Sequence, residues 1–429
     1  MTSKETLSIH QPEDILGYIP HMLGYWPEDS MVAITMQGKV LGATLRTDLP
    51  SNHSRRSHKG FAEQIRNYLV ADKEADGVVL ALYTDSGWED GGVVRTMVPL
   101  LSELQDCLDR VDLTVKDAWL VGSEYWRSAY CTDSGCCPVP GHSVDRIKHS
   151  RLSAEMVYRG RSIGPSPLAS AGTAWCRNPG PLDAKVAAAQ AKYAAELLDH
   201  GRSEGCLDAV LGVWKFVLTE RGQRKPLNAA VAEDAGLMGF LRATLTVPAW
   251  RDAVVVMAAA GHGSAKSGAT AFGMFIEDDG AWSGFDPADL GLPAPALLPA
   301  DVDADADGDV AVAGPGVSPD VYTYGDVLLG MRPDKPDWAS LNGLAEVLTS
   351  LCVEDEAGDV AAASLTLRGW ISWCKGSGSV AHAQLRRAAV ASPGYRLAEL
   401  LDGVLGQGII CEWALRPDSA WRGNRGVPA

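Results

Sequence analysis

Three cysteines and a histidine lie within fourteen residues, in the segment AYCTDSGCCPVPGH at 129–142. Cys131, Cys136, Cys137 and His142 have the spacing C-x4-C-C-x4-H. Zinc is commonly held by four thiolate or imidazole ligands in a tetrahedron, so the number and type of these residues suit a zinc site. The spacing suits it less well, because it lacks the two short cysteine or histidine pairs of a zinc knuckle and adjacent cysteines point in different directions.

Two other interpretations of this segment remain open. Cys131 and Cys136 could form a redox pair, or the segment could be a structural turn whose sulfurs are simply buried. The PVPG sequence at 138–141 makes a rigid bend, and Trp126 can cover the sulfurs. Arg127 alone supplies a nearby positive charge, which is too little for a strongly activated thiolate. We favour the structural turn, with metal binding and redox activity as alternatives.

A second polar group follows the first expected helix, in HMLGYWPEDSMVAI at 21–34. Glu28 and Asp29 are adjacent, so on an extended chain their side chains diverge and make a poor acid–base pair. We expect Asp29 and Ser30 to accept hydrogen bonds from backbone donors in the loop before a strand. The chain contains no HExxH motif.

The elements around these segments alternate between strands and helices. The pattern predicts a helix at 11–23 that Pro20 kinks or ends. It also predicts a β-hairpin at 31–36 and 40–49, and strands at 77–84 and 115–126. Helices are expected at 56–74 and 93–110. This alternation predicts an α+β or α/β domain over residues 7–165, a mixed sheet with flanking helices. Both polar loops leave sheet elements, so we expect them to meet in one cleft.

The rest of the chain is expected to be helical. Residues 180–282 show helical periodicity, residues 283–320 are a flexible acidic linker rich in Pro and Gly, and helices resume over 321–429. Near the end, small and apolar residues match a tetratricopeptide-like frame, namely Gly369, Ala381, Leu385, Ala388 and Pro393. One and a half such units cannot form a solenoid, so we expect a closely packed helical hairpin.

Composition limits the class of protein. The chain has 429 residues and a net charge of -16, with no long basic run, so direct binding to nucleic acid is not expected. No segment has the length and apolarity of a signal peptide or a membrane span. Nine cysteines without a secretion signal favour a cytoplasmic protein with reduced thiols, and we expect Cys206, Cys352 and Cys374 to be small core side chains.

Three stretches together resemble one family. They are PHMLGYWPEDSMVAI, WLVGSEYWRSAYCTDSGCCPVPG and GWISWCKGSGSVAHAQLRRAAVASPGYRLAELL. They are similar to the actinobacterial domain-of-unknown-function family 4192, from about residue 7 to the end, with 283–320 as an insertion. The matching positions are Pro20, Leu23, Gly24, Pro27, Glu28, Asp29, Ser30, Trp126, Cys131, Cys136, Cys137, Pro138 and Gly141. The resemblance implies no particular reaction, and it directs attention to the two N-terminal loops.

The sequence therefore favours a cytoplasmic binding or scaffold protein with a protein partner. Its cleft would be formed by the 24–30 and 126–142 loops, with Pro27, Glu28, Asp29, Ser30 and Trp126 as binding residues. The alternative is an enzyme, or a metal or redox protein, that uses the three cysteines with Glu28 and Asp29. Zinc is the only cofactor that the residues suggest, and the sequence gives no oligomeric state.

Overall fold

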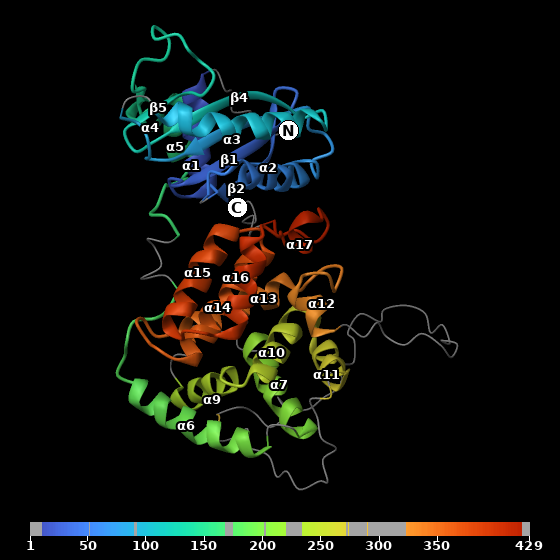
Figure 1. Ribbon diagram of the computed structural model, residues 1–429. Coiled ribbons are helices and arrows are strands. Elements are labelled where there is room, and N and C mark those ends of the chain that lie inside the picture. The colour runs from blue at the N-terminus through green and yellow to red at the C-terminus, as the bar shows by residue number, and fades with distance from the viewer. Residues whose placement is uncertain are drawn as a thin grey trace, which may run out of the picture. The chain divides into compact units, whose positions relative to one another are not determined.

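The structure is a computed structural model that divides into two compact units, Met1–Ala169 and Ser170–Ala429 (Figure 1). It describes residues 11–50, 52–89, 92–167, 175–200, 203–219, 234–271, 273, 290 and 323–422. Each unit is described by itself below. The linker expected at 283–320 lies outside the described residues, apart from Leu290.

The N-terminal unit contains a six-stranded mixed sheet in the order β2-β1-β3-β4-β5-β6. Strands β3 and β4 are parallel, and the other neighbours are antiparallel. This arrangement confirms the expected mixed sheet. The strands are β1 (Ser30–Gln37), β2 (Val40–Asp48), β3 (Gly77–Tyr83), β4 (Thr114–Val121), β5 (Tyr125–Ser128) and β6 (His142–Ser143).

The single strand predicted at 115–126 is wrong, because the chain reverses between β4 and β5. The amide of Gly122 donates to the carbonyl of Tyr125 at 2.7 Å, and the amide of Ser123 donates to the Asp85 carboxylate at 2.6 Å. Gly122 also lies against the Trp88 indole, where an added Cβ would come within 2.6 Å of Nε1. The turn therefore depends on contacts from a distant segment, which strand periodicity does not reveal.

Helices cover both faces of the sheet. Alternate residues of a strand point to opposite faces, so the strands contribute to two separate cores. Helices α2 (Arg55–Leu69) and α3 (Gly92–Asp109) pack on the face that carries Met31, Leu80 and Leu120. Helices α1 (Pro12–Leu23) and α4 (Asp145–Lys148) pack on the other face, which carries Val32 and Trp119. Helix α5 (Arg151–Tyr158) packs against α1.

Helix α1 begins as the sequence predicts, with Pro12 in its first turn. The helix does not end at Pro20, one of the two outcomes expected there, because it continues to Leu23 with Pro20 inside it. A proline removes one backbone hydrogen bond, and here less than a full turn remains after it. The helix ends at Gly24, whose φ of 82° lies in the left-handed region that glycine enters without a steric penalty.

The described part of the second unit is built from helices around one core, as expected from the sequence (Figure 1). Helices α14 and α15 pack closely, because an added Cβ on Gly369 would lie 3.2 Å from the Ala381 carbonyl. The expected helical hairpin is therefore confirmed. The helices are α6 (Asp183–His200), α7 (Glu204–Thr219), α9 (Ala235–Leu245), α10 (Pro248–Ala260), α11 (His262–Ala271), α12 (Tyr324–Leu328), α13 (Trp338–Leu351), α14 (Asp359–Cys374), α15 (Gly378–Ala391), α16 (Arg396–Gly406) and α17 (Glu412–Leu415).

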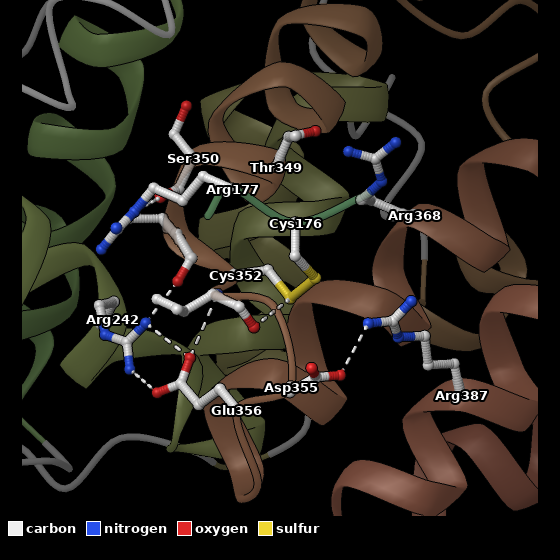
Figure 2. Close-up of a disulfide and its surroundings, with 12 residues drawn as sticks. Cys176, Arg177, Arg242, Thr349, Ser350, Cys352, Asp355, Glu356, Arg368 and Arg387 are labelled. Carbon is white, nitrogen blue, oxygen red and sulfur yellow. Dashed lines mark hydrogen bonds and ion pairs between the residues drawn. A yellow bond between two sulfur atoms is a disulfide. The ribbon is translucent and has the colours of Figure 1, made fainter. Parts of the chain in front are cut away.

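One disulfide joins Cys176 to Cys352 in this helical unit (Figure 2). Cys352, expected as a free core thiol, is therefore half of a disulfide, and that prediction is wrong. The backbone segments that carry the two cysteines are also hydrogen-bonded to each other, since the Arg177 amide donates to the Cys352 carbonyl at 2.8 Å. The two cysteines are 176 residues apart in the chain, so spacing could not reveal the bond. The other seven cysteines are free thiols, with Cys206 and Cys374 buried as expected.

Across the described ranges, no helix combines the length and the apolar character that crossing a membrane requires.

Candidate functional site

The N-terminal unit contains a cavity of about 560 Å³ on the α1 face of the sheet. Its wall combines apolar side chains with a few polar groups, as small-molecule sites do. Helices α1, α4 and α5 supply most of the wall, and the 24–30 loop and the β4–β5 turn supply one residue each. The lining residues are Gly17, His21, Trp26, Ser123, Ile147, Lys148, Ser153, Val157 and Ile163.

Trp26 reaches the cavity because of how α1 ends. After Gly24 the chain runs beside Gly164, whose amide donates to the Gly24 carbonyl at 2.8 Å. The Trp26 ring then meets the ring of Tyr83 edge to face, with 6.2 Å between centroids. The Lys148 ammonium lies 5.8 Å from the centre of the Trp26 ring, within the range of a cation–π contact.

His21 connects two walls of the cavity. Its side chain is 3% exposed, with Nδ1 2.9 Å from the Arg161 carbonyl and Nε2 3.0 Å from the Ser153 hydroxyl. Both ring nitrogens are therefore used to hold α1 against α5 and the segment that follows it. His21 thus shapes the wall and leaves Lys148 as the cavity's charged group.

A row of residues crosses the sheet beside this cavity. Ser30, Tyr83, Val121 and Trp126 are paired in register across β1, β3, β4 and β5. Among the described residues, Ser30 Oγ, Tyr83 Oη and Trp126 Nε1 are buried without a hydrogen-bond partner. Burial raises the pKa of Tyr83 well above its usual value, so its hydroxyl stays protonated. The row therefore offers buried polar groups on the same face of the sheet as α1.

Two of the predicted binding residues, Ser30 and Trp126, belong to this row, and none of the predicted binding residues lines the cavity. Pro27 and Ser30 are buried, whereas Glu28 and Asp29 are exposed. The backbone carbonyl of Asp29 accepts from the Leu49 amide at 2.9 Å, which joins the loop to the end of β2. Ser30 was expected to accept from a backbone donor, and that expectation is wrong, because its hydroxyl is without a partner among the described residues.

Trp126 lies apart from the 24–30 loop. Its strand, β5, is three strands from β1 in the sheet, so Ser30 and Trp126 are roughly 14 Å apart at the usual strand spacing. Sequence reasoning did not select Trp26 and Lys148, which line the cavity and contact each other. Trp26 stands inside the PHMLGYWPEDSMVAI stretch, so a large aromatic residue in that stretch was the available signal.

The structure also brings together three of the four predicted metal ligands. The sulfur atoms of Cys131, Cys136 and Cys137 all lie within 4.8 Å of one another. The Asp133 carbonyl accepts from the amides of Cys136 at 3.2 Å and Cys137 at 2.7 Å, which shapes the turn. The 129–142 segment, here called the thiol loop, thus forms a compact cluster of thiols.

His142 lies outside this cluster. Its Nε2 is 2.8 Å from the Cys136 carbonyl, so that nitrogen carries the hydrogen and donates it. Its Nδ1 accepts from Arg146 at 2.8 Å, and Arg146 also pairs with Glu13 of α1 at 2.8 Å. Both nitrogens are occupied in this conformation, and the histidine acts as a support that links the thiol loop to α1.

The proximity of the thiols changes their acidity. Hydrogen bonding with the Asp133 backbone, and then with the Cys137 thiol, holds the pKa of Cys131 below its usual value. Hydrogen bonding to Cys131 and the charge there raise the pKa of Cys136 to about 11. Cys131 therefore ionises before Cys136. Converging thiols of this kind can bind a soft metal or form a disulfide.

Comparison with known proteins identifies the family but no individual relative. No curated protein and no solved structure matches the chain. A model of the family described as "Domain of unknown function (DUF4192)" matches residues 12–270 and 338–410, which includes the cavity and the thiol loop. Because this match covers most of the sequence, the chain belongs to the DUF4192 family.

Proposed function

We propose that this protein is a binding protein, and that its N-terminal domain takes a small organic acid with an aromatic body into the cavity beside Trp26. The contact between Trp26 and Lys148 carries the proposal, because it places an aromatic surface and a positive charge at one wall. The apolar part of a ligand would pack on Trp26 and Val157, and its carboxylate would approach Lys148.

The size and shape of the site support a small molecule. A cavity of about 560 Å³ falls in the range that holds drug-sized ligands. Lys148 has a distant partner in Asp145, at 3.8 Å, and its side chain is 51% exposed, so a ligand carboxylate could approach it. A binding role in the cytoplasm, together with a protein partner for the helical half, remains part of this proposal, as the sequence suggested.

The test uses two probes of similar size and shape, the anionic 2-naphthoate and the neutral 2-naphthamide. Isothermal titration calorimetry on the full chain should show tighter binding of the acid than of the amide. Trp26→Ala should weaken both probes about tenfold, because stacking on an aromatic side chain contributes about 0.5–1.5 kcal/mol beyond the buried area. Lys148→Met should remove the preference for the acid while leaving the amide unchanged.

Lys39→Met is the matched control, since Lys39 is an exposed lysine in the turn between β1 and β2. It should preserve the preference for naphthoate. Equal affinities for acid and amide in the unmodified chain, or the same loss from Lys39→Met as from Lys148→Met, would rule out an organic acid held by Lys148.

A further inference from the structure

The sulfur atoms of the thiol loop are already close to the geometry that a zinc ion requires. A tetrahedral site with zinc–sulfur bonds of 2.3 Å places its sulfurs about 3.8 Å apart. The sulfur atoms of Cys131, Cys136 and Cys137 all lie within 4.8 Å of one another. Shifts of about 1 Å or less would bring them to bonding positions, which small side-chain rotations can supply.

The backbone explains how adjacent cysteines can serve one ion. The Asp133 carboxylate accepts from the Gly135 amide at 2.8 Å, and the Asp133 carbonyl accepts from both following cysteine amides. This turn holds Cys136 and Cys137 so that both sulfurs join the cluster despite their adjacency. The Cys131 thiol lies 3.8 Å from the same Asp133 carbonyl. The three thiols thus surround a common point.

The position of His142 leaves the fourth coordination position open. Its Nε2 donates to the Cys136 carbonyl from outside the cluster, so it supports a ligand without being one. Cys136 is exposed and Cys131 is half-buried, so the cluster is open to solvent. Zinc sites with three protein ligands and one open position bind water or a further ligand, whereas closed structural sites have four.

The charge near the loop is compatible with a metal–thiolate group. Three thiolates around Zn²⁺ carry a net charge of −1. Arg127 is 8% exposed, and its guanidinium donates to the Cys131 carbonyl at 3.3 Å. In the part of the chain that the structure describes, Arg127 forms no ion pair with a carboxylate and its Nε has no hydrogen-bond partner. A negative metal site would give this buried cation a neighbour of opposite charge.

We infer that Cys131, Cys136 and Cys137 bind one zinc ion through three thiolates, with the fourth position open to water or to an exogenous ligand. This site is separate from the cavity beside Trp26, so it holds whether or not an organic acid binds there. Three thiolate ligands, with no carboxylate or imidazole in the cluster, favour a soft or borderline metal over magnesium or calcium.

Metal analysis of the full chain tests the inference. Protein produced with added zinc and passed over a gel-filtration column without reductant should carry about one zinc per chain. X-ray absorption at the zinc edge should show three sulfur neighbours and one nitrogen or oxygen. The triple variant Cys131→Ala, Cys136→Ala, Cys137→Ala should lose the zinc. Cobalt(II) titration should give thiolate-to-metal absorption in the unmodified chain and none in the triple variant.

Two control variants make the outcome specific. Cys107→Ala changes a buried free thiol in α3 of the same domain and should leave the zinc content unchanged. His142→Gln should also retain zinc, because the imidazole is outside the cluster. Circular dichroism should show that each variant is folded.

Several results would overturn the inference. They are a chain without zinc, copper bound in its place, zinc retained by the triple variant, and zinc lost from the His142→Gln variant. A disulfide between two of these cysteines in the freshly purified chain, detected by peptide mass spectrometry, would instead assign the cluster to redox chemistry.

Discussion

Gly141 shows how one residue sets the shape of the thiol loop. The chain returns here to pass beside Trp126, and an added Cβ would come within 2.7 Å of the Trp126 carbonyl and 3.2 Å of the Trp88 ring. The Trp126 carbonyl belongs to the backbone, which cannot move aside as a flexible side chain can. His142 follows directly and joins the loop to α1 through Arg146. A side chain at 141 would therefore disturb both the loop and its support.

We expect Gly141→Ala to lower the free energy of unfolding of the N-terminal unit by about 1–3 kcal/mol, the range for overpacked sites. Gly135→Ala is the matched control in the same loop, where an added Cβ would meet mainly the Asp133 side chain at 3.2 Å. Urea unfolding of the full chain measures both. Equal stability of the two variants would contradict the proposed close approach at Gly141.

At the scale of elements, a small polar network fixes the edge hairpin to the loop that follows α2. The Ala43 amide on β2 donates to Thr35 Oγ1 at 2.7 Å, and the Thr35 hydroxyl donates to the Asp72 carboxylate at 2.5 Å. Gln37 donates to the other Asp72 oxygen at 2.9 Å. These hydrogen bonds, with the Thr35 hydroxyl as the main cause, hold the pKa of Asp72 below its usual value.

This pKa shift predicts a pH dependence. Because the folded-state pKa of Asp72 is below the unfolded one, its carboxylate stabilises the hairpin above the unfolded-state pKa, and that contribution is lost as pH falls through the folded-state pKa. We expect Asp72→Asn to increase hydrogen exchange in residues 40–48 at neutral pH. The difference from the unmodified chain should shrink on acidification. A difference of constant size at every pH would contradict a role for the ionised carboxylate.

At the scale of the whole molecule, the Cys176–Cys352 disulfide joins distant parts of the sequence within the helical unit. Polar contacts surround it (Figure 2), including Arg177 Nε, which donates to the Ser350 carbonyl at 2.9 Å, and the ion pair of Arg242 with Glu356. The bond lies in the same core as α13 and α14. Such a bond stabilises mainly by restricting the unfolded chain, since it closes a long loop.

Reduction of this disulfide should lower the stability of the helical unit by about 2–4 kcal/mol. Urea unfolding with and without a phosphine reductant measures the change. The Cys176→Ala variant should resemble the reduced chain and should not respond further to reductant. An unmodified chain whose unfolding midpoint is unaffected by reductant would show that the disulfide adds no stability.

The sequence by itself determined the class of fold. Apolar runs bounded by turn residues predicted the β1–β2 hairpin and β3, helical periodicity predicted α1 and α3, and small residues such as Gly369 predicted the close α14–α15 hairpin. These features depend on neighbours within one element or its immediate successor. Local patterns of polarity and size therefore carry enough information to specify them.

Tertiary structure alone decided the site. Trp26 and Lys148 are more than a hundred residues apart in the sequence, and they meet only in the folded domain. The turn at Gly122 and the Cys176–Cys352 bond likewise depend on distant partners. In the thiol loop, the sequence spacing identified the three cysteines as candidate metal ligands. Only the structure showed that His142 is not among them, because its ring hydrogen-bonds to the Cys136 carbonyl. Contacts between remote segments follow from packing, which no local pattern encodes.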